Sequence, residues 1–292
     1  MTSEGTAQTD AAGAQSADST VGSAIQEDDS SEALFDSVVS GYWDVLSGHP
    51  ALFVVFALFG AVRAGVYVVR SAVEIPQHDV SVPLQGTFSV DLALLPTGPS
   101  LAHPLPGTFR GLVPELLAVY ALTTVAWLLA LTLAVGVVAW RTAPGTDGWL
   151  PPRRRLAHLG GFVVVAQILT IPLLDGFLSG FVLTTILTLV AVYLITRLFI
   201  APVTIVRDGR GLRSGIAWSW RATRQTWPLF VVFVLAFGLV RYWITGIPLS
   251  LVVDATVPVR ASVGTALVGS AYAVLLCVAY DIVATNYDEP SR

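Results

Sequence analysis

The stretch Arg197-Leu-Phe-Ile-Ala-Pro202 opens the part of the chain that decides the fold. It is followed by Arg207-Asp-Gly-Arg-Gly-Leu-Arg-Ser-Gly-Ile-Ala-Trp-Ser-Trp-Arg-Ala-Thr-Arg224, and then by an apolar run that starts at Pro228 and ends near Ile247. An apolar segment that stops, a basic segment with helical periodicity and a second apolar segment follow one another here. This order predicts a helix that leaves a membrane, a helix that lies in the interface and a helix that enters the membrane again.

The composition of the whole chain agrees with a membrane location. Hydrophobic residues make up 54% of the 292 residues and charged residues 12%, with a mean hydropathy of +0.71, whereas about 25% of the residues of an average soluble domain are charged. All 16 basic residues are arginine, and Ala, Val, Gly and Asp are used heavily. The chain is therefore expected to be an integral membrane protein, and this usage is typical of a halophilic archaeon.

Six apolar segments are predicted to cross the membrane, because about twenty apolar residues suffice for a helix to span it. The predicted spans are residues 50–69, 112–140, 159–174, 177–195, 228–247 and 262–284, and the predicted interfacial amphipathic helices are residues 33–47 and 211–227. The expected fold class is all-α, a polytopic membrane helix bundle over residues 32–284. Residues 1–31 lack large apolar side chains and are expected to be a disordered acidic tail, and 285–292 a C-terminal tail.

Small residues in the last span predict a close helix contact. Ser262, Ala266 and Ser270 are spaced by four residues, so they share one face of a helix. Small side chains at this spacing let the backbone of a neighbouring helix approach.

The arginines predict how the chain is threaded. They are concentrated in the connections after the second and fourth spans, and basic connections stay on the cytoplasmic side. These connections hold Arg141, Arg153, Arg154, Arg155, Arg197, Arg207, Arg210, Arg213, Arg221 and Arg224, whereas the other loops hold Arg70, Arg110 and Arg260. A multi-pass protein of the cell membrane with both termini in the cytoplasm is therefore expected.

The interfacial helix at 211–227 is predicted to carry a basic face. At about 100° per residue, one side of this helix collects Leu212, Ile216, Trp220, Thr223 and Trp227, and the opposite side collects Arg210, Arg213, Arg221 and Arg224. Such a helix lies flat on a membrane with its arginines toward headgroups or water. The four arginines are therefore candidate contacts for anionic lipid.

Two segments far apart in the chain resemble each other. Leu52-Phe-Val-Val-Phe56 recurs as Leu229-Phe-Val-Val-Phe233, and each copy follows a proline and precedes an intramembrane arginine, Arg63 or Arg241. The order of these features favours an internal duplication over chance recurrence of apolar residues. If both copies start on the cytoplasmic side, the repeat is parallel.

An arginine inside a membrane is costly unless it is paired, hydrated or able to reach the interface. Candidate partners for Arg63 and Arg241 are Glu115, Asp175 and Asp254. One interpretation is a charged site that faces a cavity. The other is a structural ion pair or a side chain that reaches to the interface.

Motifs for catalysis, metals and nucleotides are missing from the sequence. It contains no Walker loop, HExxH pair or GxSxG elbow, and its glycines after Asp208 have the spacing GxGxxxG instead of GxGxxG. His78 and His103 lack ligand spacing, and Cys277 is the single cysteine. We therefore expect no cofactor, no metal and no nucleic-acid partner, and an enzymatic function is disfavoured.

The quoted stretch also resembles a known family. A span that ends in Arg197-Leu-Phe-Ile-Ala-Pro202, a turn at Asp208-Gly209 and Ile216-Ala-Trp-Ser-Trp-Arg-Ala-Thr-Arg224 before a new span are similar to the six-span membrane domain of some glycerophosphoryl diester phosphodiesterases and to related stand-alone prokaryotic proteins. In those enzymes a separate soluble barrel carries out hydrolysis. The resemblance therefore implies an architecture and no catalytic residue.

These observations lead to two functional hypotheses. The first is a non-catalytic scaffold or accessory subunit that engages anionic lipid or an unknown protein partner through its interfacial helices. The alternative is a small transporter or permease component in which Arg63 and Arg241 line a cavity.

Overall fold

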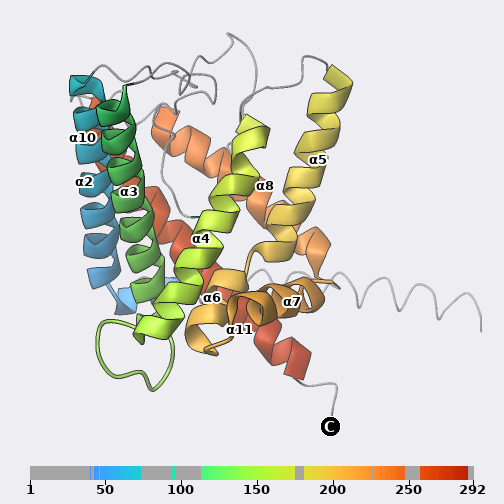
Figure 1. Ribbon diagram of the computed structural model, residues 1–292. Coiled ribbons are helices and arrows are strands. Elements are labelled where there is room, and N and C mark those ends of the chain that lie inside the picture. Colours follow the sequence, from blue (N-terminus) through green and yellow to red (C-terminus); the bar gives the residue numbers. More distant parts are fainter. Residues whose placement is uncertain are drawn as a thin grey trace, which may run out of the picture.

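The computed structural model describes residues 40, 43–45, 47–73, 94–95, 113–174, 181–224, 226–246 and 257–288. Every regular element in this part of the chain is a helix, which confirms the all-α class (Figure 1). The elements are α2 (Ala51–Ala72), α3 (Pro114–Arg141), α4 (Arg153–Leu174), α5 (Phe181–Leu198), α6 (Ala201–Arg207), α7 (Leu212–Ala222), α8 (Trp227–Gly246), α10 (Val257–Gly264), the π-helix η2 (Thr265–Gly269) and α11 (Ser270–Asp288).

The helices form an upright bundle with two short helices at one end. α6 and α7 lie at the lower end in Figure 1, which is called the base. α2 begins at the base and α11 ends there, so the first and last described long helices meet the same end of the bundle. α2 packs between α3 on one side and α10 with η2 on the other.

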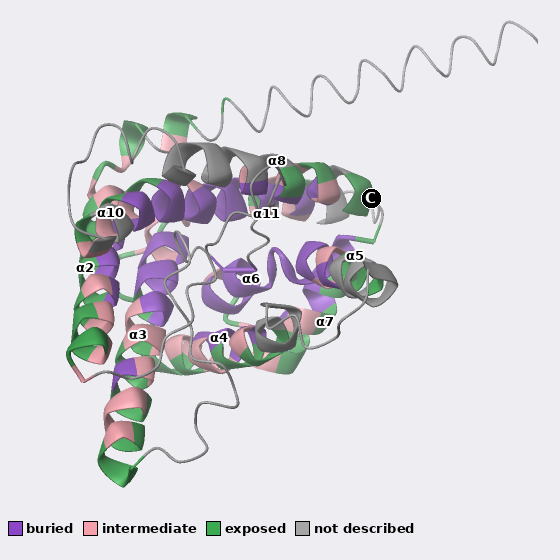
Figure 2. Cartoon of the chain, turned by 90° about the horizontal axis from the view of Figure 1, so that it is seen from above, coloured by how far each residue is buried: buried purple, intermediate pink, exposed green. Residues whose placement is uncertain are grey.

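Four helical stretches are long and apolar enough to cross a membrane. They are Ala51–Ala72, Pro114–Arg141, Leu189–Arg207 and Ser262–Thr285. Leu58 and Leu122 are 64% and 71% exposed, and Figure 2 shows further exposed positions along α2 and α3. Large exposed apolar side chains on long apolar helices suit lipid and not water, which supports the assignment to a membrane.

Prolines mark where several helices begin. Pro50 directly precedes α2, Pro114 is the first residue of α3, and Pro202 and Pro228 are the second residues of α6 and α8. The first turn of a helix has no intrahelical partner for its N–H groups, so the missing N–H of proline costs nothing there. Proline thus lies at the start of four helices that are far apart in the chain.

The helix of the predicted fourth span extends beyond the predicted end of that span. The span was expected to stop at residue 195, before the charge of Arg197, but the helix continues to Leu198 and resumes as α6 after a two-residue turn. Residues 201–206 are all buried, and Arg197 is 8% exposed. The prediction took the charge of Arg197 as a boundary, whereas the folded chain packs around it.

α4 also starts earlier than its predicted span. The predicted span began at residue 159, but the helix begins at Arg153, so the arginine triplet forms its first turn. The connection before it turns at Gly145 and Gly148, both with positive φ (69° and 84°), which glycine adopts without steric cost. The helix therefore begins before the apolar run, at the arginine triplet.

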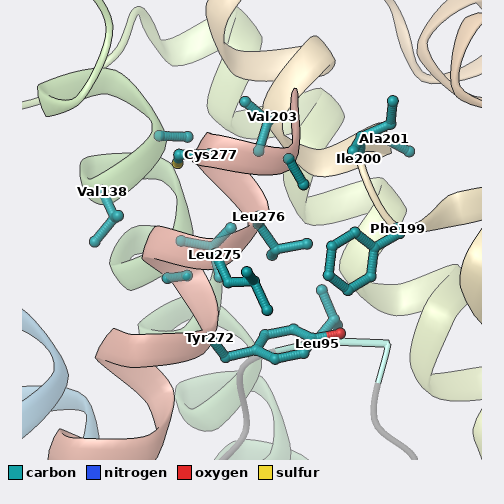
Figure 3. Close-up of a cluster of buried hydrophobic side chains, with 14 of the residues drawn as sticks. Leu95, Val138, Phe199, Ile200, Ala201, Val203, Tyr272, Leu275, Leu276 and Cys277 are labelled. Atoms are coloured by element: carbon teal, nitrogen blue, oxygen red, sulfur yellow. The ribbon is translucent and has the colours of Figure 1, made fainter. Parts of the chain in front are cut away.

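The core lies where α11 meets α3 and the α5–α6 turn (Figure 3). Phe199 and Tyr272 make an edge-to-face contact with ring centroids 5.6 Å apart, and Leu276 and Cys277 are buried beside them. Leu95, from the connection between α2 and α3, is also buried here. Cys277 is thus a packing residue, as its position in an apolar run indicated.

The predicted close contact of the last span exists, and its partner is α2. Ser262 Oγ donates a hydrogen bond to the Gly60 carbonyl oxygen at 3.1 Å. A Cβ atom on Gly60 would lie 2.6 Å from the carbonyl oxygen of Ser262, a distance that real Cβ atoms do not tolerate. Glycine at this position therefore permits the backbones of α2 and α10 to touch.

We expect Gly60→Ala to destabilise the bundle, because the new methyl group forces α2 and α10 apart. Overpacking of this kind costs about 1–3 kcal/mol, which exceeds the gain of at most about 1 kcal/mol in helix propensity. Thermal unfolding in detergent measures the effect. Gly65→Ala is the matched control, because nothing lies within 4 Å of its added Cβ; equal melting temperatures for the two variants would contradict the packing argument.

Candidate functional site

Arg207 joins three helices at the base of the bundle. Its side chain is 6% exposed; its Nε donates to the Ala139 carbonyl oxygen at 3.1 Å, and its Nη2 to the Thr142 carbonyl oxygen at 2.9 Å and to the Thr142 hydroxyl at 2.8 Å. Its Nη1 forms an ion pair with Asp281 of α11. A cation at the carbonyl end of α3 is favourable, because that end carries partial negative charge.

Arg155 caps the carbonyl end of α6, as Arg207 caps the carbonyl end of α3. Its Nη1 donates to the carbonyl oxygens of Val206 and Arg207 at 2.7 and 2.8 Å, and its guanidinium stacks over the Trp140 ring at 5.2 Å. Gly209 has a φ of +68°, and a Cβ there would lie 3.0 Å from Arg155. Glycine is therefore needed at this predicted turn for two reasons. The positive φ favours glycine, and a side chain would crowd the guanidinium of Arg155.

Asp208 connects α6, α7 and α11. One of its carboxylate oxygens accepts a hydrogen bond from the Tyr280 hydroxyl at 2.5 Å, and the other accepts one from Arg210 Nε at 2.8 Å. Arg210 also stacks over the Trp218 ring at 5.1 Å. Arg210, predicted to contact lipid, thus has a partner within the protein, and its side chain is 38% exposed.

α7 packs against the bundle through small residues and one tryptophan. Its buried residues are Gly215, Trp218, Ser219 and Ala222. A Cβ on Gly215 would lie 2.6 Å from the Ile205 side chain, so glycine permits α7 to cross α6 closely.

The buried side of α7 differs from the apolar side seen in the sequence. Of the predicted apolar residues, Thr223 is buried, Leu212 and Ile216 are half-buried, and Trp220 is 38% exposed. Trp227, at the start of α8, is 43% exposed. Close packing selects the narrow side of the helix, where small residues lie, over the side with the largest apolar residues.

The three remaining arginines of the predicted basic face are exposed. Arg213, Arg221 and Arg224 lie on the side of α7 and its following turn that points away from the bundle, and they are called the basic face. Arg221 Nε donates to the Ala217 carbonyl oxygen of its own helix at 3.2 Å. Arg153 and Arg154, in the first turn of α4, are exposed as well.

The predicted intramembrane charges are only partly within the described residues. Arg63 is 5% exposed, and its Nη1 lies 3.4 Å from the Thr265 hydroxyl of η2. Glu115 is exposed in the first turn of α3. Asp175, Asp254 and the Arg241 side chain lie outside the described residues, so the pairing of these charges stays a prediction.

The sequence placed Arg155 and Arg207 only among the basic residues of the connections, and it did not point to Tyr280 or Asp281. The available signal was Asp281, an acid near the end of the predicted last span, where an acid is unusual. The described residues include no group of three or more His, Cys, Asp or Glu side chains that could hold a metal.

Comparison of the chain with family models, curated proteins and solved structures finds no match. The resemblance to the membrane domain of the phosphodiesterases therefore stays a prediction, and the function is argued from the geometry of the base.

We expect Arg207→Gln to lower the free energy of unfolding by roughly 2–4 kcal/mol, because it removes an ion pair and leaves helix-end carbonyls without their charged donor. Chemical denaturation in detergent measures this loss. Arg213→Gln removes the same charge from an exposed position and should change stability by less than about 0.5 kcal/mol. Similar losses in the two variants would mean that Arg207 does not hold the base together.

Proposed function

We propose that this chain is a multi-pass scaffold or accessory protein of the cell membrane that contacts anionic lipid headgroups through its basic face. The observation that carries the proposal is the exposure of Arg213, Arg221 and Arg224 on one side of a helix whose other side is packed into the bundle. Because the packed side fixes the rotation of α7, the basic face is held in one direction. The contact is with lipid headgroups, and no reaction is proposed.

The direction in which the helices cross the membrane follows from the exposed arginines at the base. α4 and α8 have 22 and 20 residues, enough for two further crossings beside the four long apolar stretches, which gives six spans. The exposed Arg153 and Arg154 lie at the start of α4, at the base. By the positive-inside rule the base faces the cytoplasm, and both termini follow it there.

Aromatic residues at the side of α7 support an interfacial position. Trp220 of α7 and Trp227 at the start of α8 are 38% and 43% exposed, and tryptophan is enriched where hydrocarbon meets headgroups. Each arginine close to an anionic surface contributes about 1 kcal/mol. Three of them give a preference for anionic lipid that is strong enough to measure and weak enough to be reversible.

The proposal includes the internal repeat and the family resemblance. α2 and α8 both begin beside a proline, Pro50 and Pro228, and both start near the base, as parallel copies of one unit require. The interfacial helices predicted before these spans, at 211–227 and at 33–47, most of which lies outside the described residues, are consistent with this arrangement. So is the layout of the phosphodiesterase membrane domain. The resemblance to that domain implies an architecture and no activity.

Transport is less well supported than lipid contact. Arg63 is buried beside Thr265, at the one π-helix of the described residues. A buried arginine with a hydroxyl partner between two tightly packed helices suits a structural role. We therefore propose no transport pathway through Arg63.

Replacing Arg213, Arg221 and Arg224 together by Gln should reduce the preference for anionic lipid at least about threefold, because it removes the surface attraction. The association of spin-labelled phosphatidylglycerol relative to phosphatidylcholine with the reconstituted protein measures this preference. The triple Lys variant keeps the charges and should behave like the wild type, and high salt should weaken both. An unchanged preference in the Gln variant would refute the proposal.

The threading is tested by labelling single cysteines from outside the cell. In a Cys277→Ala chain, Ser214→Cys at the exposed side of α7 should react with a membrane-impermeant maleimide only after the cells are opened. Val113→Cys, exposed at the start of α3 and at the opposite end, should react in intact cells. The reverse pattern would place the base outside.

A further inference from the structure

Arg197 is a buried cation whose bonding capacity is largely unused. It lies in the last turn of α5 and is 8% exposed. Its Nη1 reaches the Trp220 carbonyl oxygen at a long 3.4 Å, and its Nε is buried without a hydrogen-bond partner. A guanidinium has five N–H donors, and Arg197 forms no ion pair with any described residue.

Two aromatic rings cover this guanidinium. The centroids of the Tyr193 and Trp220 rings lie 5.1 and 5.6 Å from Arg197 Cζ, and the two rings meet edge to face at 5.7 Å. Both residues are partly open to the outside, with 41% and 38% exposed. The Arg197 site, defined by these three residues, thus consists of a buried charge behind a half-exposed aromatic surface.

The main-chain contacts hold the site in place. The Ser219 hydroxyl donates to the carbonyl oxygen of Arg197 at 2.7 Å, so the end of α5 and the end of α7 are locked together. Thr226, in the connection from α7 to α8, has a buried hydroxyl that also lacks a hydrogen-bond partner, and α5 contacts both of these helices. The junction of α5, α7 and α8 thus holds two buried polar groups, Arg197 Nε and the Thr226 hydroxyl, that have no hydrogen-bond partner among the described residues.

We propose that the Arg197 site binds the phosphate group of one membrane lipid. A buried guanidinium without an anion is unfavourable, and a phosphate oxygen is the acceptor that matches its planar donors best. The half-exposed rings suit the boundary between headgroup and acyl chains, which points to a lipid and not to a free anion. Access to the buried Nε requires one of the two rings to turn outward.

This site goes beyond the lipid contact proposed for the basic face. The basic face attracts anionic headgroups in general, whereas the Arg197 site holds one molecule in a defined place. The site does not need Arg213, Arg221 or Arg224 in order to bind. Each proposal can therefore fail while the other stands.

The test uses full-length protein, stripped of lipid in an uncharged detergent and titrated with phosphatidylglycerol, or separately with inorganic phosphate. Native mass spectrometry counts the bound lipid, and thermal unfolding reports the stabilisation. Wild type and the triple Gln variant of the basic face should each retain one lipid per chain in a saturable way and melt at a higher temperature with it. Arg197→Gln should bind this lipid at least tenfold more weakly.

Three results would overturn the proposal. They are the absence of one-to-one lipid retention in the wild type, equal retention in Arg197→Gln, and stabilisation by inorganic phosphate that matches that by lipid. Should Arg197→Gln fail to fold, Arg197→Lys keeps the charge but lacks the planar fork, and it should bind several-fold more weakly. Unchanged binding in that variant would equally exclude the site.

Discussion

The structure depends on the contact of Arg207 with the end of α3 and with Asp281. In a membrane, apolar side chains gain little by leaving lipid for protein, so packing and hydrogen bonds decide how helices associate. Arg207 supplies hydrogen bonds to two carbonyl groups and one hydroxyl of α3 together with an ion pair to α11. One side chain of the short helix α6 thus fixes the relative position of two long helices.

The direction of α7 is set by the residues that directly follow Arg207. The carbonyl groups at the end of α6 are capped by Arg155, the chain turns at Gly209, and Asp208 is held by Tyr280 and Arg210. Each of these bonds constrains the few residues between α6 and α7. The basic face points away from the bundle because the start of α7 has little freedom left, and its amphipathic pattern alone would have allowed another rotation.

The sequence was sufficient to predict the class of fold, but it was insufficient to predict the contacts at the base of the bundle. Apolar length predicted the helices, and the prolines at 50 and 228 predicted where two of them begin. Arg197 and Arg207 were assigned to a connection between spans, because a charge in a sequence is seen without its partners. Those partners are carbonyl groups and rings brought together by folding, and a list of residue types does not contain them. The rotation of α7 was missed for a related reason, since Gly215 and Ser219 contribute little to an apolar pattern but permit the closest approach.

Arg207 and Arg197 show what complete and incomplete pairing mean in one protein. Both are buried and both lie near the end of a helix, but Arg207 is surrounded by acceptors and an acid, whereas Arg197 has one long hydrogen bond and two rings. The first is explained entirely by the protein's own atoms. The second has donors that these atoms leave unused, behind two half-exposed aromatic rings. Cation–π contacts recover only part of the lost hydration of a guanidinium, so an acceptor from the membrane completes what the chain does not.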